Sequence, residues 1–247
     1  MQIPTYISNI TIVINIVVPA VVGYGFSRVS HSAGLTENVR SRLVTAVTLF
    51  LVIWVTLAFG LGIAGFFAPN DNQIIPNIAL TAVPLLLGIG LLSVVGFRRI
   101  LVVMPLEWAV GIQFVRAIGI FFLILSARGL MPAAFAGPAG WGDVLTGIAA
   151  PVAAFALVTK RRWARPFTFI WNLFGMADLV TAVTLGVLTS PGILQQLALN
   201  QPNTLITSFP IILIPSLAVP LMMILHIVSL YQLFAQPQQH IVETAVA

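Results

Sequence analysis

The sequence predicts an all-α polytopic membrane protein, a bundle of about seven transmembrane helices that forms a single domain over residues 1–247. Of its 247 residues, 59% are hydrophobic and only 7% are charged, and the mean hydropathy is +1.07. Soluble domains carry about 25% charged residues, so this chain has too few charges to cover a surface that faces water. Most of it must therefore face lipid or other buried helices.

Apolar segments of membrane-spanning length follow one another along the whole chain. A transmembrane helix needs about 20 predominantly apolar residues, and the segments between them leave no room for a soluble domain. The first segment lacks a positively charged start and a small-residue cleavage site, which predicts a retained helix and not a signal peptide. The predicted spans lie near residues 8–27, 43–67, 77–97, 107–127, 142–159, 166–188 and 206–234.

The basic residues predict the orientation of the chain. They gather after spans one, three and five, whereas the opposite loops, which include the stretch "APNDNQ", carry only Arg128. By the positive-inside rule the N-terminus is outside and the C-terminus is cytoplasmic, and we expect a multi-pass protein of the bacterial inner membrane. The basic residues punctuate apolar spans instead of forming a stripe, so the pI of 10.8 does not predict a nucleic-acid partner. The cytoplasmic set is Arg28, Arg40, Arg42, Arg98, Arg99, Lys160, Arg161, Arg162 and Arg165.

Several chemistries are not supported by the sequence. The chain has no cysteine, so it offers no disulfide, thiolate nucleophile or thiolate metal site. It shows no phosphate loop, metalloprotease helix or nucleophile elbow, and nothing in it favours an enzyme. A seven-span bundle with its N-terminus outside resembles rhodopsins in outline, but the single lysine, Lys160, falls in a loop, so a retinal Schiff base is not expected.

One heptapeptide, "LVTAVTL", occurs at residues 43–49 and again at residues 179–185. This resembles the two parallel repeats of sugar and vitamin transporters of the SWEET type. The first copy opens its span, however, while the second lies past the middle of its own. We interpret the repeat as accidental.

Two ionisable residues, Arg116 and Asp178, are predicted to lie deep inside the membrane. They lie roughly 14 Å and 18 Å from the cytoplasmic ends of spans four and six, at the rise of an α-helix. A charge near the bilayer centre costs about 2.5–3.5 kcal/mol, so both should face the bundle and find partners. An ion pair between them is therefore predicted, either as a functional site or as a pair that only fixes helix packing. The predicted inward faces are Gln113, Arg116 and Gly119 on span four, and Gly175, Asp178, Ala182 and Gly186 on span six.

Gln113, Asn172 and His226 are expected in the cytoplasmic half of the same site. His226 belongs to a last span that is interrupted by prolines, whose freed carbonyls need partners. The histidine could be hydrogen-bonded within the bundle, relay protons, or serve as an axial haem ligand. Haem would need a second ligand such as Met176, Met222 or Met223.

Asp143 is expected at the outer start of span five. A carboxylate there would be stabilised by the helix N-terminus. The alternative is that Asp143 is the outer gate of a pathway that continues to Arg116 and Asp178, with Trp141 beside it.

These residues predict an integral membrane protein that binds and transports a small solute or proton at Arg116 and Asp178. Asp178 would be the protonatable residue, and Arg116 would hold an anionic group or neutralise Asp178. One alternative is a sensor or electron carrier that binds haem or a lipophilic pigment through His226. The other is an accessory subunit of a larger membrane complex. The expected partners are lipid, a small ligand or ion, and either a second copy or another membrane protein.

Overall fold

The computed structural model describes residues 3–68 and 74–235, and the predicted helical fold is confirmed over these ranges. Every regular element in them is a helix and none is a strand. Among the described residues, 6 helices are long and apolar enough to cross a membrane, or up to 7 if one sharply bent pair counts as a span. The stretch "APNDNQ" lies almost entirely outside the described residues.

The helices begin where proline or polar residues interrupt the apolar runs. Pro105 and Pro132 lie immediately before two of the spans, where a fixed φ and a missing N–H suit a helix start. The elements are α1 (Thr5–Ser30), α2 (Glu37–Ile63), α3 (Ile74–Leu91), α4 (Val95–Val103), α5 (Leu106–Gly111), η1 (Ile112–Gly119), α6 (Ile120–Ala127), α7 (Ala133–Val158), α8 (Ala164–Thr189), η2 (Leu205–Thr207), η3 (Ile214–Ala218) and α9 (Val219–Ala235).

The third predicted span, 77–97, is not one straight helix. The chain turns by 88° between α3 and α4. On α4, Phe97, Ile100 and Leu101 are buried, while Arg99 is exposed. An amphipathic helix of this kind lies along the bundle end, because its arginines could not continue through an apolar span.

Two other spans have boundaries that differ from the prediction. Span five begins at Ala133 and not near residue 142, because the small residues and Pro138 before Asp143 are helical. The continuous helix of span seven begins at Ile214 and not at 206, where the chain forms only the short 3₁₀ turn η2. Prolines disturb that entry, and other helices satisfy the freed carbonyls: Trp54 Nε1 donates to Ser216 O at 2.8 Å, and Thr81 Oγ1 donates to Pro215 O at 2.8 Å.

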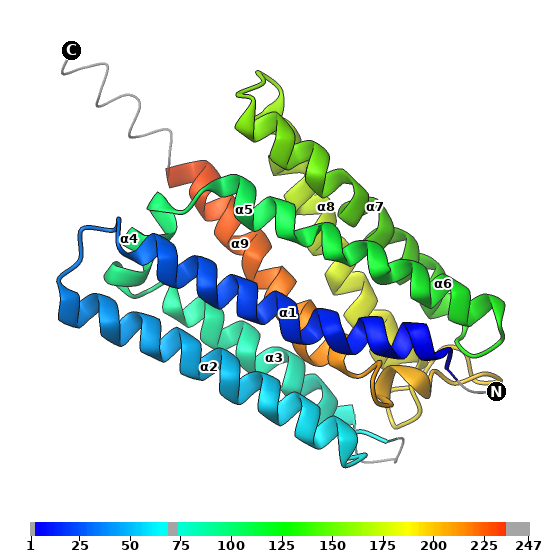
Figure 1. The fold of residues 1–247 in the computed structure, drawn as a ribbon. Helices are drawn as coiled ribbons and strands as arrows, with labels where there is room; N and C mark the ends of the chain where they lie inside the picture. Colours follow the sequence, from blue (N-terminus) through cyan, green and yellow to red (C-terminus); the bar gives the residue numbers. More distant parts are fainter. Residues whose placement is uncertain (1–2, 69–73, 236–247) are drawn as a thin grey trace.

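Helix α9 lies at the centre of the bundle. It contacts α3, α4, α5 and α8, and its span is 56% buried, more than any other. Figure 1 shows α1, α2 and α3 on one side of it and the α5–η1–α6 span, α7 and α8 on the other. The start of α1 and the end of α9 lie at opposite ends of the bundle, as expected for an odd number of crossings (Figure 1).

The most extensive helix packing joins α7 to η1 and to α8. Gly147 permits this, because a Cβ added there would overlap the backbone of Arg116 and Ala117. Small residues let membrane helices approach this closely. The polar residues of the predicted site lie along this tightly packed seam.

Candidate functional site

Arg116 projects from a 3₁₀ segment, η1, in the middle of a membrane-spanning helix. In a 3₁₀ helix the side chains at i and i+3 eclipse one another. Gln113, Arg116 and Gly119 therefore share one face, and all three are buried. The predicted inward face of span four is confirmed.

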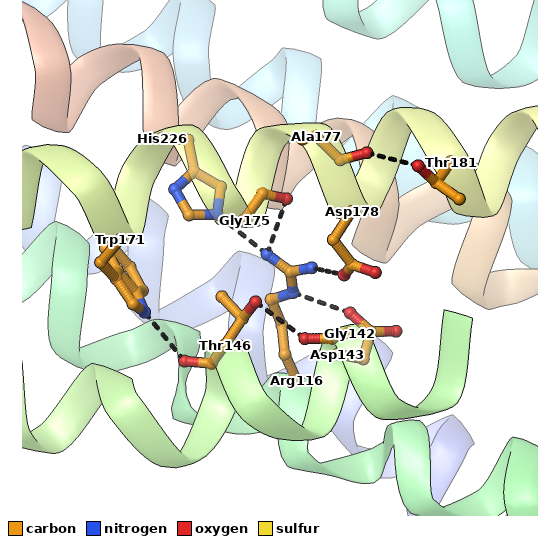
Figure 2. A network of polar contacts seen from close by, with 10 residues as sticks. All are labelled: Arg116, Gly142, Asp143, Thr146, Trp171, Gly175, Ala177, Asp178, Thr181 and His226. Carbon is orange, nitrogen blue, oxygen red and sulfur yellow. Dashed lines mark hydrogen bonds and ion pairs between the residues drawn. The ribbon is translucent and has the colours of Figure 1, made fainter. Parts of the chain in front are cut away.

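The guanidinium of Arg116 joins three other helices (Figure 2). Its Nε donates to Asp143 Oδ1 on α7 at 2.7 Å, and its Nη2 donates to Asp178 on α8. Its Nη1 lies 3.2 Å from Gly175 O and 2.9 Å from His226 Nε2 on α9. The predicted pairing of Arg116 with Asp178 is present. We call Arg116, Asp143, Asp178 and His226 the Arg116 cluster.

Asp143 does not lie at the start of a helix, so the helix-start interpretation is wrong. Helix α7 begins at Ala133, which places Asp143 well inside the span, and its carboxylate is bound to Arg116. The error arose because the small residues before Asp143 resemble a loop in composition. The structure thus brings a second carboxylate to the arginine.

His226 is a neutral hydrogen-bond acceptor towards Arg116. A guanidinium has no acceptor, so the Nε2 atom that faces it must carry no proton. The proton is then on Nδ1, which lies 2.9 Å from Asn172 Oδ1. The Asn172 amide in turn donates to Thr168 O at 2.8 Å and to Ser229 Oγ at 2.9 Å. One continuous set of hydrogen bonds therefore runs from Arg116 to Ser229.

The ionisable groups of the Arg116 cluster are buried, and their charges cancel only if one carboxyl group is protonated. The side chains of Arg116, Asp178 and Asp143 are 3%, 6% and 13% exposed. With both carboxylates ionised, one positive and two negative charges leave a net charge of −1. In Figure 2 the carboxylate oxygens that do not contact the arginine point away from His226.

Gly175 brings His226 and Arg116 together. A Cβ added at this position would overlap the imidazole of His226 and crowd Arg116 Nη1. Gly175 and Asp178 are buried, as the predicted stripe requires, whereas Ala182 and Gly186 are only partly buried. The last two line a pocket.

Gln113 is buried on the same face as Arg116, but its side chain is not part of the hydrogen-bonded network. Neither Nε2 nor Oε1 has a hydrogen-bond partner among the residues that the structure describes. Gln113 therefore lies beside Arg116, as predicted, but its side chain forms no hydrogen bond with Asn172 or His226.

Two pockets reach the Arg116 cluster, and Asp143 lines both. The first, which we call the Asp143 pocket, lies between α3, α6, α7, α8 and the segment before α9, and it holds about 690 Å³ of empty space including its open mouth. The second lies between α1, η1 and α9 and also reaches Arg116. Residues of the Asp143 pocket include Phe122, Phe135, Asp143, Val183, Thr207 and Ile214.

A haem site at His226 does not fit the contacts of this side chain. The imidazole is fully buried, and both of its nitrogens already have hydrogen-bond partners. An axial iron ligand needs a free nitrogen, so ligation would break the contact with Arg116 or with Asn172. Within 3–68 and 74–235, no three His, Cys, Asp or Glu side chains converge on a metal position.

Several participants in this network are not among the residues predicted from the sequence. Thr168 and Ser229 hold Asn172, and Trp171 Nε1 donates to Thr146 O at 3.0 Å beside the His226 ring. Thr168 precedes Asn172 by one helical turn, and Ser229 follows His226 by nearly one. That spacing was a usable signal, since residues three or four apart share a helix face.

Residues 73–234 match the family described as "Domain of unknown function (DUF8737)". The matched range includes every residue of the Arg116 cluster, together with Gln113, Asn172 and Ser229, and leaves out α1 and α2. No curated protein and no solved structure matches the chain.

Proposed function

The chain belongs to the DUF8737 family, and we propose that it is an integral membrane protein that binds and moves a proton, and with it a small solute, through the Arg116 cluster. The single observation that carries this proposal is the pair of carboxylates on one arginine. With both ionised, the buried cluster has a net charge of −1, which is costly within a membrane. One proton, bound by either carboxylate of the coupled pair, makes the cluster neutral.

The contacts of Arg116 favour a neutralising role over binding of an anionic solute. Every nitrogen of the guanidinium already donates to Asp143, Asp178, Gly175 O or His226. These contacts use four of its five N–H groups, and two carboxylates already lie against its positive charge, which disfavours an additional anion. The moving charge is thus a proton or a cation, and Asp143 and Asp178 are the groups that carry it.

A route for the proton is supported on one side of the cluster, where Asp143 lines the Asp143 pocket. On the other side, His226, Asn172 and Ser229 form a connected set of hydrogen bonds. That set meets the carboxylates only through Arg116, which does not release a proton, so it holds the arginine in place and is not the proton route.

We further propose that the N-terminus lies outside and the C-terminus in the cytoplasm of a bacterial inner membrane. The basic segments support this, because the end of α1, the start of α2, α4 and the connection from α7 to α8 lie at one end of the bundle (Figure 1). The chain has no cysteine, so single cysteines can report the orientation without background. Arg128→Cys should react with an impermeant maleimide on intact cells, and Arg161→Cys only after lysis.

Proton flux into liposomes tests the functional proposal. The protein is reconstituted with an internal pH-sensitive dye, and a potassium diffusion potential drives proton entry. We expect flux above that of protein-free vesicles, and loss of the excess in Asp178→Asn and in Asp143→Asn. Glu37→Gln, which alters an exposed acid on α2, is the matched control and should retain the flux.

Two outcomes would overturn the proposal. The first is wild-type flux no greater than that of empty vesicles. The second is full flux in a folded Asp178→Asn protein, as judged by its elution profile and melting temperature. Full tolerance of Asp178→Asn together with co-purification of a partner would instead favour an accessory subunit.

A further inference from the structure

We propose that the solute is an organic cation with an apolar body, which binds in the Asp143 pocket with its charge on Asp143. This inference rests on the proposed function and adds the chemical class of the ligand. It depends on three properties of the pocket: its mostly apolar walls, hydroxyl groups whose protons are already donated, and a lining that holds one carboxylate and two aromatic rings.

The walls of the Asp143 pocket suit an apolar body. They are formed mostly by aliphatic and aromatic side chains from α6, α7, α8 and the segment that leads into α9. A small ion with its hydration shell would gain nothing from these walls, whereas an organic ligand would bury its surface against them.

The side-chain hydroxyls that line the pocket, among the residues the structure describes, have no free proton for an anion. Ser190 Oγ donates to Gly186 O at 2.6 Å, and Thr207 Oγ1 donates to Thr204 O at 3.1 Å. Thr81 Oγ1 donates to Pro215 O at 2.8 Å. These hydroxyl protons are therefore committed to backbone carbonyls, and an anionic ligand would lose its hydration without a hydroxyl donor in exchange.

The charged and aromatic groups of the pocket favour a cation. Asp143 is the one charged residue among those that line it within the described parts of the chain. The rings of Phe122 and Phe135 lie 5.2 Å apart, nearly perpendicular, and both face the same pocket. Aromatic faces attract ammonium groups through their negative quadrupoles, and a carboxylate in the same pocket attracts them by its charge.

Cation binding and proton binding are mutually exclusive in this arrangement. When the cation arrives, the O–H bond of the protonated carboxyl in the Arg116 cluster breaks and that proton leaves to water. The cation then supplies the positive charge that the proton supplied before. The ionisable groups in contact with Arg116, namely Asp143, Asp178 and His226, otherwise keep their charges. One cation is thereby exchanged for one proton.

Calorimetry with a matched pair of probes tests the inference. Benzyltrimethylammonium is titrated into the full-length protein in mild detergent, and neopentylbenzene, its uncharged carbon isostere, is the control probe. We expect the ammonium to bind at least about tenfold more tightly than the isostere. Titrations in buffers of different ionisation enthalpy should show the release of close to one proton per bound cation.

Variants of the pocket then locate the site. Asp143→Asn should weaken cation binding more than about tenfold, and Phe135→Leu by about fivefold, since the leucine keeps the apolar wall and removes the aromatic face. Ala182→Leu should block the pocket without touching Arg116. Trp141→Leu, on the exposed face of the same helix as Asp143, is the control and should bind normally.

Equal affinity for the two probes, or cation binding that is unaffected by both Phe135→Leu and Ala182→Leu, would overturn the inference. Failure of the inference is distinguishable from failure of the proposed function. Proton flux that depends on Asp178, without cation binding, would disprove only the ligand class. Cation binding without proton flux would disprove proton movement.

Discussion

Two arginines of this chain bind carboxylates in very different surroundings. Arg40 pairs with Glu37 at the start of α2, where the glutamate side chain is 76% exposed. Arg116 pairs with Asp143 and Asp178 inside the bundle, where the arginine side chain is only 3% exposed. An exposed pair contributes about 0–1 kcal/mol, because water and salt screen it. Only the buried pairs constrain both the packing of the helices and the number of protons that their carboxylates hold.

The same contrast separates whole regions of the molecule. The span of α2 is 17% buried, whereas that of α7 is 44% buried. The residues matched by the family begin after α2 and include the entire Arg116 cluster. Helices α1 and α2 therefore present most of their surface to lipid, and the chemistry is concentrated in η1, α7, α8 and α9.

Removal of Arg116 should have the largest effect on stability. Arg116→Leu leaves two carboxylates buried without a counter-charge, and we expect a loss of about 3–5 kcal/mol in the free energy of unfolding. Arg40→Leu is the matched control and should cost about 0–1 kcal/mol. Denaturant unfolding in detergent measures both. Similar losses in the two variants would show that burial does not make the ion pairs of Arg116 more important for stability than that of Arg40.

A substitution that disturbs the close approach of α7 to η1 should have the next largest effect on stability. Gly147→Ala places a methyl group on the backbone of Arg116 and Ala117, and overpacking of this kind should cost about 2–3 kcal/mol. Gly137→Ala lies on the same helix with open space around it and should cost nothing measurable. The shift in melting temperature compares the two. Equal shifts would mean that α7 and η1 are not in close contact.

The hydrogen bonds of Asn172 should matter less than the ion pairs. Asn172→Ala leaves the Nδ1 proton of His226 without an acceptor, at a cost of about 1–2 kcal/mol. Thr181→Ala, an exposed hydroxyl on the same helix, is the control and should be neutral. Unfolding curves of the two proteins provide the test. A neutral Asn172→Ala would mean that His226 is not held through this amide.

The smallest effect is expected on the lipid-facing side of α2. Ile53 is 56% exposed in the bundle, so Ile53→Ala should change the free energy of unfolding by less than about 0.5 kcal/mol. The same unfolding assay applies. A large loss would show that another protein or a second copy covers this face.

The sequence predicted the residues of the cluster better than the contacts between them. The distance of a residue from the end of its helix follows from the constant rise per residue. Arg116 and Asp178 could therefore be assigned similar heights on two parallel spans. The contact of His226 with Arg116 could not be predicted from the sequence. It depends on the rotation of α9 about its axis and on the 3₁₀ geometry of η1. Asp143 was misplaced because small residues and Pro138 lower the hydropathy of a segment that is helical all the same.

The central claim is that one proton is shared by Asp143 and Asp178, and infrared spectroscopy tests it most directly. A protonated carboxyl group has a C=O stretching band that a carboxylate lacks. We predict this acid band in the wild-type protein at neutral pH and its loss in both Asp143→Asn and Asp178→Asn, with Glu37→Gln unchanged. A wild-type spectrum without the acid band would contradict the account, because the cluster would then hold two ionised carboxylates and no proton.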